Sequence, residues 1–445
     1  MNSKIKNLIN HQGIRRYGIN TLWLLGERVL RIFAGLLVGI WVARYLGPSQ
    51  FGVFSYVLAF VGLFAPLAKL GMDGIISRDV AREETDLNQL LSSSFLMKLL
   101  GALFVVFFTT GYMIFTKNDP IYTYLAIVLS FVFVVKSFEV LEFYFRAKVK
   151  GIYISVANSV GIIVVSLLKI IFILSSFPLI YFAIANLIEV LIAILLLLFF
   201  FRREAVFLSP SFSSVRQGGR LLKESWPLIF SGFFTLIYLN IDQIMIEEML
   251  DSYDVGQYSA AARVSGALFF IPMTIGWSIQ TLVVNAKKQC ESLYYERLQQ
   301  LFSLLATLAY MLILPVYVFS AEIVLFLFGQ EYIEAGSVLA LHIWSSLFIF
   351  VGLIRGLWVV NESYFRFDLV SNMVAGVINV VLNYIWLPKF GIIGAAWATL
   401  ISYAVTFIIS GVFFKPARKI VVMQLKSIFL YDVFKQVIKL SKLLF

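Results

Sequence analysis

The chain has 445 residues, of which 60% are hydrophobic and only 14% are charged, whereas a soluble globular domain is about half apolar and about a quarter charged. This composition excludes an ordinary soluble protein and predicts an all-α polytopic membrane protein. With one cysteine and two histidines, the chain has neither a disulfide framework nor the residues for a His/Cys metal cluster. We attribute the net charge of +11 to membrane topology and to attraction by anionic lipid, and not to nucleic acid.

Twelve apolar stretches are long enough to cross a bilayer, which takes about 20 residues. The residues before the first stretch are polar and basic and lack the pattern of a cleavable signal peptide, so we expect a mature, cytoplasmic N-terminus. The predicted spans are 22–43, 51–68, 90–115, 121–145, 153–174, 178–201, 225–246, 255–283, 299–328, 335–360, 369–387 and 391–414.

The distribution of lysine and arginine predicts the orientation. Most of them lie in the N-terminal tail, in the even-numbered connections and in the C-terminal tail, while the odd-numbered connections contain only Arg44, Lys117 and Lys389. Because positive loops stay in the cytoplasm, both termini are predicted to be cytoplasmic. In the last residues, 430–445, the spacing puts apolar side chains on one face of a helix and mostly basic side chains on the other. This pattern predicts a helix that lies on the inner membrane surface.

Short sequence segments that occur twice in the chain predict two related halves. The sequence E-x-Y-F-R occurs at 142–146 and again at 362–366, near the inner ends of spans 4 and 10. "FGVFSY" (51–56) resembles "VGQYSA" (255–260), and "AIANLI" (183–188) resembles "AWATLI" (396–401). Since each half has an even number of spans, both halves enter the membrane in the same direction, and we expect a pseudo-twofold axis along the membrane normal with a substrate path between the halves.

The predicted domains follow from these spans. They are a cytoplasmic N-terminal tail (1–21), an N-lobe with six helices (22–201), a cytoplasmic linker (202–224), a C-lobe with six helices (225–414) and a basic amphipathic cytoplasmic tail (415–445).

Arginines inside the spans are candidates for binding an anionic substrate, because a charge in hydrocarbon costs at least ~2.5 kcal/mol and usually faces a cavity or a partner. Arg28 and Arg31 share one face of span 1 with two glycines, and Glu27 can neutralise Arg31 at i, i+4. Arg263 has no acidic neighbour on its own helix. Arg355 is a further candidate, although Glu362 is close enough in sequence to reach it. The alternative for Arg28 and Arg31 is interhelical bridging or snorkelling toward the inner surface, and for Arg263 and Arg355 it is pairing with a partner.

Other charges favour pairing. Lys136 and Glu139 are spaced at i, i+3 and can satisfy each other. Asp242, a lone acid in span 7, is a candidate site for a coupling proton or sodium ion, or else it pairs with an arginine of another helix. Both E-x-Y-F-R copies place Glu and Arg at i, i+4, and we interpret these pairs, with their Tyr-Phe core, as interfacial anchors in preference to a headgroup grip.

The sequence lacks a phosphate-binding G-x-x-x-x-G-K-[ST] loop, an H-E-x-x-H motif and a nucleophile elbow. The outward connections are short, which leaves little room for a catalytic ectodomain. We therefore expect a transporter and no enzyme, with no cofactor and no metal.

Three stretches resemble a known family. The run 43–82, "ARYLGPSQFGVFSYVLAFVGLFAPLAKLGMDGIISRDVAR", looks like the signature region of bacterial Wzx-type polysaccharide (O-antigen) flippases, which belong to the multidrug/oligosaccharidyl-lipid/polysaccharide exporter superfamily. "KESWPLIFSGFF" (223–234), "IDQIMI" (241–246) and "VGQYSAAARVS" (255–265) resemble the start of the second half in the same family.

The resemblance implies an alternating-access exporter in the bacterial inner membrane. Its substrate would be an undecaprenyl-diphosphate-linked oligosaccharide, carried from the cytoplasmic to the periplasmic leaflet, and Arg28, Arg31 and Arg263 would contact the diphosphate. Candidate protein partners are a polysaccharide polymerase and a chain-length regulator, besides membrane lipids and a coupling H⁺ or Na⁺. The alternatives are a cation-coupled multidrug exporter of the same superfamily and a membrane polysaccharide polymerase. The fourteen-helix cell-wall precursor flippases are disfavoured, because only the amphipathic tail follows span 12.

Overall fold

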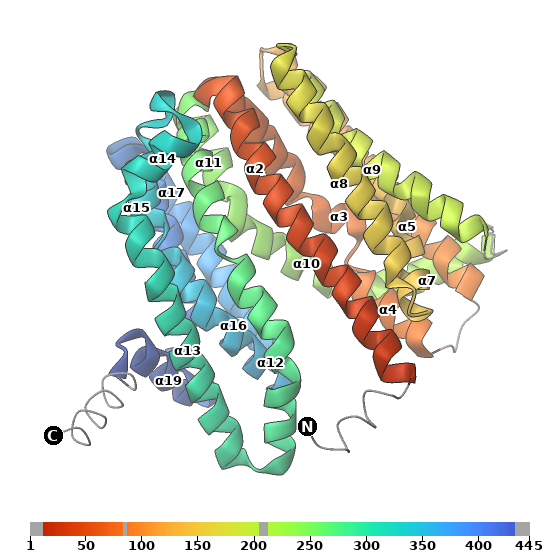
Figure 1. Cartoon of the computed structure of the whole chain (residues 1–445), viewed down its shortest axis with the longest axis vertical. Helices are drawn as coiled ribbons and strands as arrows, with labels where there is room; N and C mark the ends of the chain where they lie inside the picture. The colour runs from red at the N-terminus through yellow and green to blue at the C-terminus, as the bar shows by residue number, and fades with distance from the viewer. Residues whose placement is uncertain (1–11, 83–86, 204–211, 432–445) are drawn as a thin grey trace. The chain divides into compact units, whose positions relative to one another are not determined.

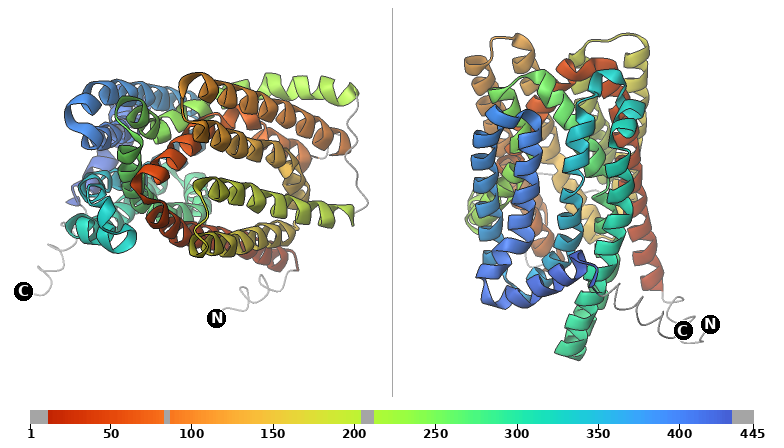
Figure 2. Two further views of the ribbon diagram at one scale, coloured as in Figure 1. Left: turned by 90° about the horizontal axis from the view of Figure 1, so that it is seen from above. Right: turned by 90° about the vertical axis from the view of Figure 1, so that its left-hand side faces the viewer.

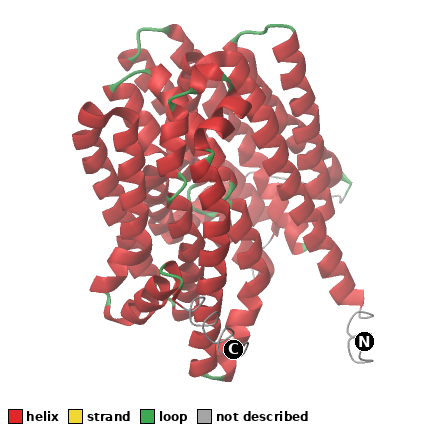
Figure 3. Ribbon diagram, turned by 60° about the vertical axis from the view of Figure 1, so that its left-hand side comes forward, coloured by secondary structure: helices red, strands yellow, loops and turns green. Residues whose placement is uncertain are grey.

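The computed structural model describes residues 12–82, 87–203 and 212–431. Its regular elements within these ranges are all helices (Figure 3). By their contacts, the helices form two compact units. The first contains residues 1–46 and 57–233, and the second contains residues 47–56 and 234–445.

The first unit contains most of α2 and all helices up to the first half of α10 (Figure 1). Their bounds are α2 Gln12–Leu63, α3 Ala65–Lys69, α4 Asp73–Arg82, α5 Leu87–Thr116, α6 Pro120–Lys136, η1 Ser137–Glu139, α7 Val140–Ala147, α8 Gly151–Leu174, α9 Leu179–Arg202 and α10 Phe212–Met249.

The second unit contains the middle of α2, the end of α10 and all later elements. Their bounds are α11 Ser252–Ala267, α12 Phe270–Gln289, α13 Glu291–Val318, α14 Ser320–Phe328, η2 Gln330–Tyr332, α15 Ala335–His342, α16 Ser345–Glu362, α17 Phe365–Ala404, the π-helical turn η3 Val405–Ile409, α18 Ser410–Phe413, η4 Lys415–Ala417 and α19 Arg418–Ile428.

Ten helical segments of the described chain are long and apolar enough to cross a membrane, which confirms the predicted all-α polytopic class. Two of the ten, Gly18–Leu63 and Phe365–Phe413, have 46 and 49 residues, or about 70 Å at 1.5 Å per residue, against a hydrocarbon core of about 30 Å. Each is broken at a glycine with positive φ, at Gly47 (φ 70°) and Gly391 (φ 56°). Glycine tolerates this backbone conformation without steric strain, so the chain can turn there.

The core of the first unit is aliphatic and aromatic. It includes Met72, Leu90, Leu91 and Phe145, all fully buried. Helices α8 and α9 lie side by side (Figure 1), because Gly161 on α8 leaves no side chain between them. A Cβ at Gly161 would lie 2.8 Å from the carbonyl oxygen of Glu189 on α9. This close approach fixes the position of Glu189, which belongs to the site described below.

In the second unit, α11 packs on the middle of α2 through two glycines. A Cβ added to Gly52 would lie 1.6 Å from the carbonyl oxygen of Ser252, and a Cβ added to Gly256 would lie 2.0 Å from the carbonyl oxygen of Pro48. Gly52 and Gly256 are the matching glycines of "FGVFSY" and "VGQYSA". The two similar segments therefore lie where the backbones of α2 and α11 cross in direct contact. Small residues permit such close helix crossings in membrane proteins.

The last helix of the described residues, α19, lies against α13 (Figure 2). The amide nitrogen of Gln299 donates to the Ser427 hydroxyl at 2.9 Å, and the Tyr310 hydroxyl donates to the carbonyl oxygen of Ile428 at 2.9 Å. The predicted surface helix at 430–445 lies almost wholly outside the described residues, which end at Tyr431.

Candidate functional site

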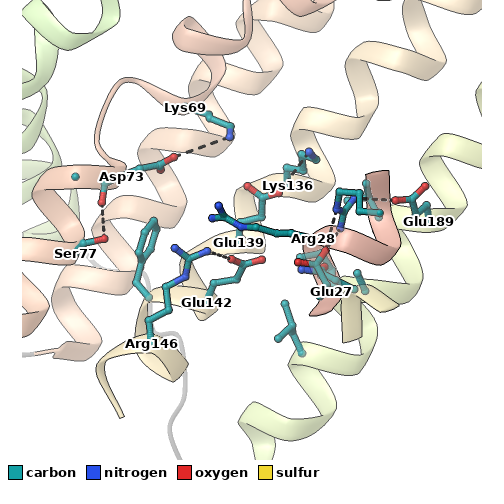
Figure 4. A pocket seen from close by; sticks show the side chains of 18 residues that line it. Glu27, Arg28, Lys69, Asp73, Ser77, Lys136, Glu139, Glu142, Arg146 and Glu189 are labelled. Atoms are coloured by element: carbon teal, nitrogen blue, oxygen red, sulfur yellow. Dashed lines mark hydrogen bonds and ion pairs between the residues drawn. The ribbon is translucent and has the colours of Figure 1, made fainter. Parts of the chain in front are cut away.

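A polar cavity of about 590 Å³ opens inside the first unit (Figure 4). Five basic and five acidic side chains line it: Arg28, Arg31, Lys69, Lys136 and Arg146, and Glu27, Asp73, Glu139, Glu142 and Glu189. They come from α2, α3, α4, α6, η1, α7 and α9. A balanced set of charges inside an apolar helical unit is costly to build, which marks the cavity as the candidate functional site.

Local helix breaks bring the charges of the fourth predicted span to the cavity. α6 ends at Lys136, the 3₁₀ turn η1 follows, and α7 begins at Val140. Such a turn inside a long helix changes the helical phase, and it often marks a functional position. Lys136 and Glu139 form the predicted i, i+3 ion pair, at 3.6 Å, and both line the cavity.

Arg31 is held by two carboxylates. Its guanidinium lies 2.8 Å from Glu27 Oε1, as predicted from their i, i+4 spacing, and 3.0 Å from Glu189 Oε1. Arg28 lies three residues earlier on the same helix and points into the cavity (Figure 4). Both arginines therefore place a guanidinium at the cavity, and that of Arg31 is paired with two carboxylates.

The first E-x-Y-F-R copy belongs to the cavity wall. Arg146 donates to Glu142 at 2.8 Å, so the predicted i, i+4 pair is confirmed. Both side chains face the same space as Arg28 (Figure 4). This placement favours the headgroup-grip interpretation of the motif over that of a simple interfacial anchor.

The second copy behaves differently, and the predicted Glu362–Arg366 pair is wrong. α16 ends at Glu362, Ser363 adopts the left-handed conformation (φ 59°), and α17 starts at Phe365. The two residues are therefore on different helices, and the Glu362 carboxylate instead pairs with Lys287 Nζ at 2.9 Å. The break leaves Arg366 without its predicted partner.

Arg355 is buried in the second unit, with a side chain that is 3% exposed. Its guanidinium donates to Asp368 at 2.9 Å and to the Ser371 hydroxyl at 3.2 Å. The expectation that Glu362 reaches Arg355 is wrong, because Asp368 on the next helix takes that place. A charge satisfied in this way makes Arg355 the weakest of the four candidate arginines.

Arg263 also lies in the second unit, on α11. Its guanidinium carbon is 5.2 Å from the centroid of the Phe51 ring, a cation–π contact. Among the residues that the structure describes, Arg263 forms no ion pair with a carboxylate. A ring face thus stabilises its charge, while no carboxylate of the described chain neutralises it.

Asp242 is 2% exposed and is surrounded by neutral hydrogen-bond donors. It accepts hydrogen bonds from Tyr258 at 2.8 Å, from Thr399 at 2.5 Å and from Asn383 at 2.5 Å. Asn383 also donates to Asn379 Oδ1 at 3.1 Å. The predicted alternative, in which Asp242 pairs with an arginine, is not what the structure shows, because all these partners are uncharged.

The sequence interpretation missed three side chains of this cluster, Asn379, Asn383 and Thr399. The two asparagines are four residues apart in "NVVLNY", so they share one helix face inside an apolar span. Such a polar pair within hydrocarbon was the available signal. Thr399 lies in "AWATLI", a repeated sequence that indicates only the register of the two halves.

Known proteins share this arrangement of helices. The structure is similar to that of a lipid II flippase, MurJ, in an inward closed conformation, with a TM-score of 0.68 and 16% identity over 94% of this chain and 92% of that one. It is also similar to an inward-facing multidrug resistance transporter of the MATE family, with a TM-score of 0.65 and 15% identity over 88% of this chain and 96% of that one. At these identities the likeness shows the fold alone, which this chain shares with both proteins.

The sequence comparisons identify the family to which the chain belongs. Residues 18–283 match the family model described as polysaccharide biosynthesis protein, and residues 227–385 match the MatE model. A probable low-salt glycan biosynthesis flippase, Agl15, of Haloferax volcanii is 26% identical over 82% of this chain and 77% of its own length. The chain belongs to the polysaccharide biosynthesis protein family, and the resemblance drawn from the sequence is confirmed.

Proposed function

We propose that the protein is a flippase for an undecaprenyl-diphosphate-linked oligosaccharide, such as an O-antigen unit, and that it moves this lipid from the cytoplasmic to the periplasmic leaflet by alternating access. The cavity of the first unit is the observation that carries the proposal. The membership of the chain in a family of polysaccharide biosynthesis proteins supports a glycan as the transported substrate.

The chemistry of the cavity suits such a substrate. A guanidinium binds phosphate oxygens through two parallel hydrogen bonds and keeps its charge when desolvated, which suits Arg28 to the diphosphate. Carboxylates such as Glu139 and Glu142 accept hydrogen bonds from sugar hydroxyls. We propose Arg28, Arg31 and Arg263 as the diphosphate-binding residues, with Arg355 in a positioning role through Asp368.

We further propose twelve crossings in two six-helix lobes, with both termini in the cytoplasm of a bacterial cell and the chain in the inner membrane. The glycine breaks at Gly47 and Gly391 support this number, because each divides a segment that is long enough for two crossings. A polysaccharide polymerase and a chain-length regulator would act on the translocated units.

Asp242 is the proposed site of the coupling ion. Hydrogen bonds join its carboxylate, the Thr399 hydroxyl and the amides of Asn383 and Asn379 in one buried cluster. Two amide atoms there, Asn383 Oδ1 and Asn379 Nδ2, have no hydrogen-bond partner. A carboxylate with neighbouring hydroxyl and amide oxygen atoms can bind a sodium ion, and the carboxylate alone can bind a proton.

Asp242→Asn tests this site. The amide keeps the size of the side chain but removes the charge, so we expect membrane abundance close to the wild type and glycan translocation at least about tenfold slower, because the site no longer exchanges an ion. Transport assayed under imposed sodium and proton gradients measures this. Normal translocation that still responds to either gradient would refute a coupling role for Asp242.

A strain that lacks the gene tests the function. The flippase proposal predicts that lipid-linked oligosaccharide units accumulate on the inner leaflet and that surface polysaccharide is lost. Units that reach the periplasm but stay unpolymerised would favour the polymerase alternative. Intact polysaccharide together with increased drug sensitivity would favour the multidrug exporter.

A further inference from the structure

A second cavity, of about 980 Å³, lies in the second unit and is mostly apolar. Its walls come from the start of α17, the π-helical turn η3, and α18 with the residue that follows it. The apolar residues that line it include Phe365, Val370, Val374, Ile409 and Phe413. We call this cavity the α17 groove.

The break in the second E-x-Y-F-R copy shapes one end of the groove. Because Ser363 turns the chain, the rings that follow it line the groove: Phe367 stacks on Phe414 with centroids 4.5 Å apart, and Tyr364 lies edge-on to Phe414 at 5.2 Å. Ser371, which is bound by Arg355, forms part of the wall. The same end is therefore held rigidly by aromatic contacts and hydrogen bonds.

The groove opens on exposed apolar surface of a candidate membrane span. Val370, Val374 and Ile409 are 56%, 44% and 43% exposed, and Phe413 is 82% exposed. All lie within the candidate membrane span Phe365–Phe413. In a membrane the neighbours of such a surface are lipid chains, so a hydrocarbon chain is a better occupant than a peptide or a soluble ligand.

Positive charge gathers at one end of the groove. Arg366 lines it, and within the described part of the chain no carboxylate pairs with this arginine. The nearest acids in sequence are committed elsewhere, Glu362 to Lys287 and Asp368 to Arg355. Lys415 directly follows Phe414, a lining residue, and its side chain is exposed. An apolar trough that is lined by an arginine, with a lysine next in sequence to another lining residue, matches a lipid with an anionic headgroup.

We propose that the α17 groove is a binding site for an anionic phospholipid such as phosphatidylglycerol, with an acyl chain in the trough and the phosphate at Arg366 and Lys415. The site is separate from the charged cavity assigned to the transported lipid. It would keep an anionic lipid attached where α16, α17 and α18 meet.

Native mass spectrometry of the full chain, purified in detergent and titrated with phosphatidylglycerol or phosphatidylethanolamine, tests the proposal. We expect the wild type to retain phosphatidylglycerol in preference. Arg366→Gln should weaken phosphatidylglycerol binding about fivefold, the effect of about one basic residue at an anionic membrane surface, and should leave phosphatidylethanolamine binding unchanged. Lys426→Gln, a matched loss of an exposed cation on α19, should have no such effect.

Two further variants separate charge from shape. Arg366→Lys keeps the charge and should restore most of the preference, while Ile409→Trp fills the trough and should lower the retention of both lipids. Equal retention of the two lipids by the wild type, or an Arg366→Gln variant with unchanged preference, would overturn the proposal. So would displacement of phosphatidylglycerol by undecaprenyl phosphate at much lower concentration, because the groove would then belong to the transport path.

Discussion

We expect Arg28→Gln to abolish surface polysaccharide display while the protein stays in the membrane. The side chain points into the charged cavity, where its guanidinium can meet a phosphate group (Figure 4). Removing a guanidinium that binds phosphate costs about 1.5–3 kcal/mol of hydrogen bonding to a charged group, or roughly ten- to a hundredfold in substrate affinity. Surface polysaccharide on gels, together with the membrane abundance of the variant, measures the effect.

The matched control is Arg44→Gln. Arg44 is an exposed arginine on the same helix and does not line the cavity, so its loss should leave display unchanged. Arg28→Lys should restore display only in part, since lysine offers a point charge without the planar fork. Normal display by Arg28→Gln at normal abundance would show that the cavity does not bind the diphosphate through this residue.

The second large effect is structural, and it concerns the glycine crossing of α2 and α11. Gly256→Ala puts a methyl group 2.0 Å from the carbonyl oxygen of Pro48, so the backbones must separate. Overpacking of this kind costs about 1–3 kcal/mol or more. We expect a clearly lower thermal unfolding temperature in detergent and reduced accumulation in the membrane.

Gly266→Ala is the control for this prediction. Gly266 lies on the same helix α11, and a Cβ there would have no atom within 4 Å. Alanine should therefore leave the unfolding temperature unchanged or raise it, because it is the better helix former. If both alanine variants melt at the wild-type temperature, the crossing does not hold α2 against α11 as tightly as the structure indicates.

The interactions that sequence could predict are local ones. Glu27–Arg31, Lys136–Glu139 and the pair in the first E-x-Y-F-R copy all follow from helical spacing. Their common cavity could not be predicted, because it depends on the η1 turn and on how α2, α4 and α9 pack.

The second E-x-Y-F-R copy shows why spacing alone is not sufficient. The same five-residue pattern predicted the same i, i+4 pair, but a single left-handed residue, Ser363, ends the helix between its acid and its arginine. Glu362 therefore pairs with Lys287, which is distant in sequence, instead of with Arg366. Helix termination of this kind had no signal in the pattern, since neither glycine nor proline occurs there.

The central claim is translocation of a lipid-linked glycan, and proteoliposomes test it most directly. The purified chain is reconstituted with a labelled polyprenyl-diphosphate oligosaccharide, and a membrane-impermeant glycosidase is added outside. If the protein is a flippase, nearly all of the label becomes accessible with the wild type, while only the outer-leaflet share does so with Arg28→Gln or with empty vesicles. Accessibility with the wild type that stays at the outer-leaflet share, with the imposed ion gradient verified, would contradict the proposed function.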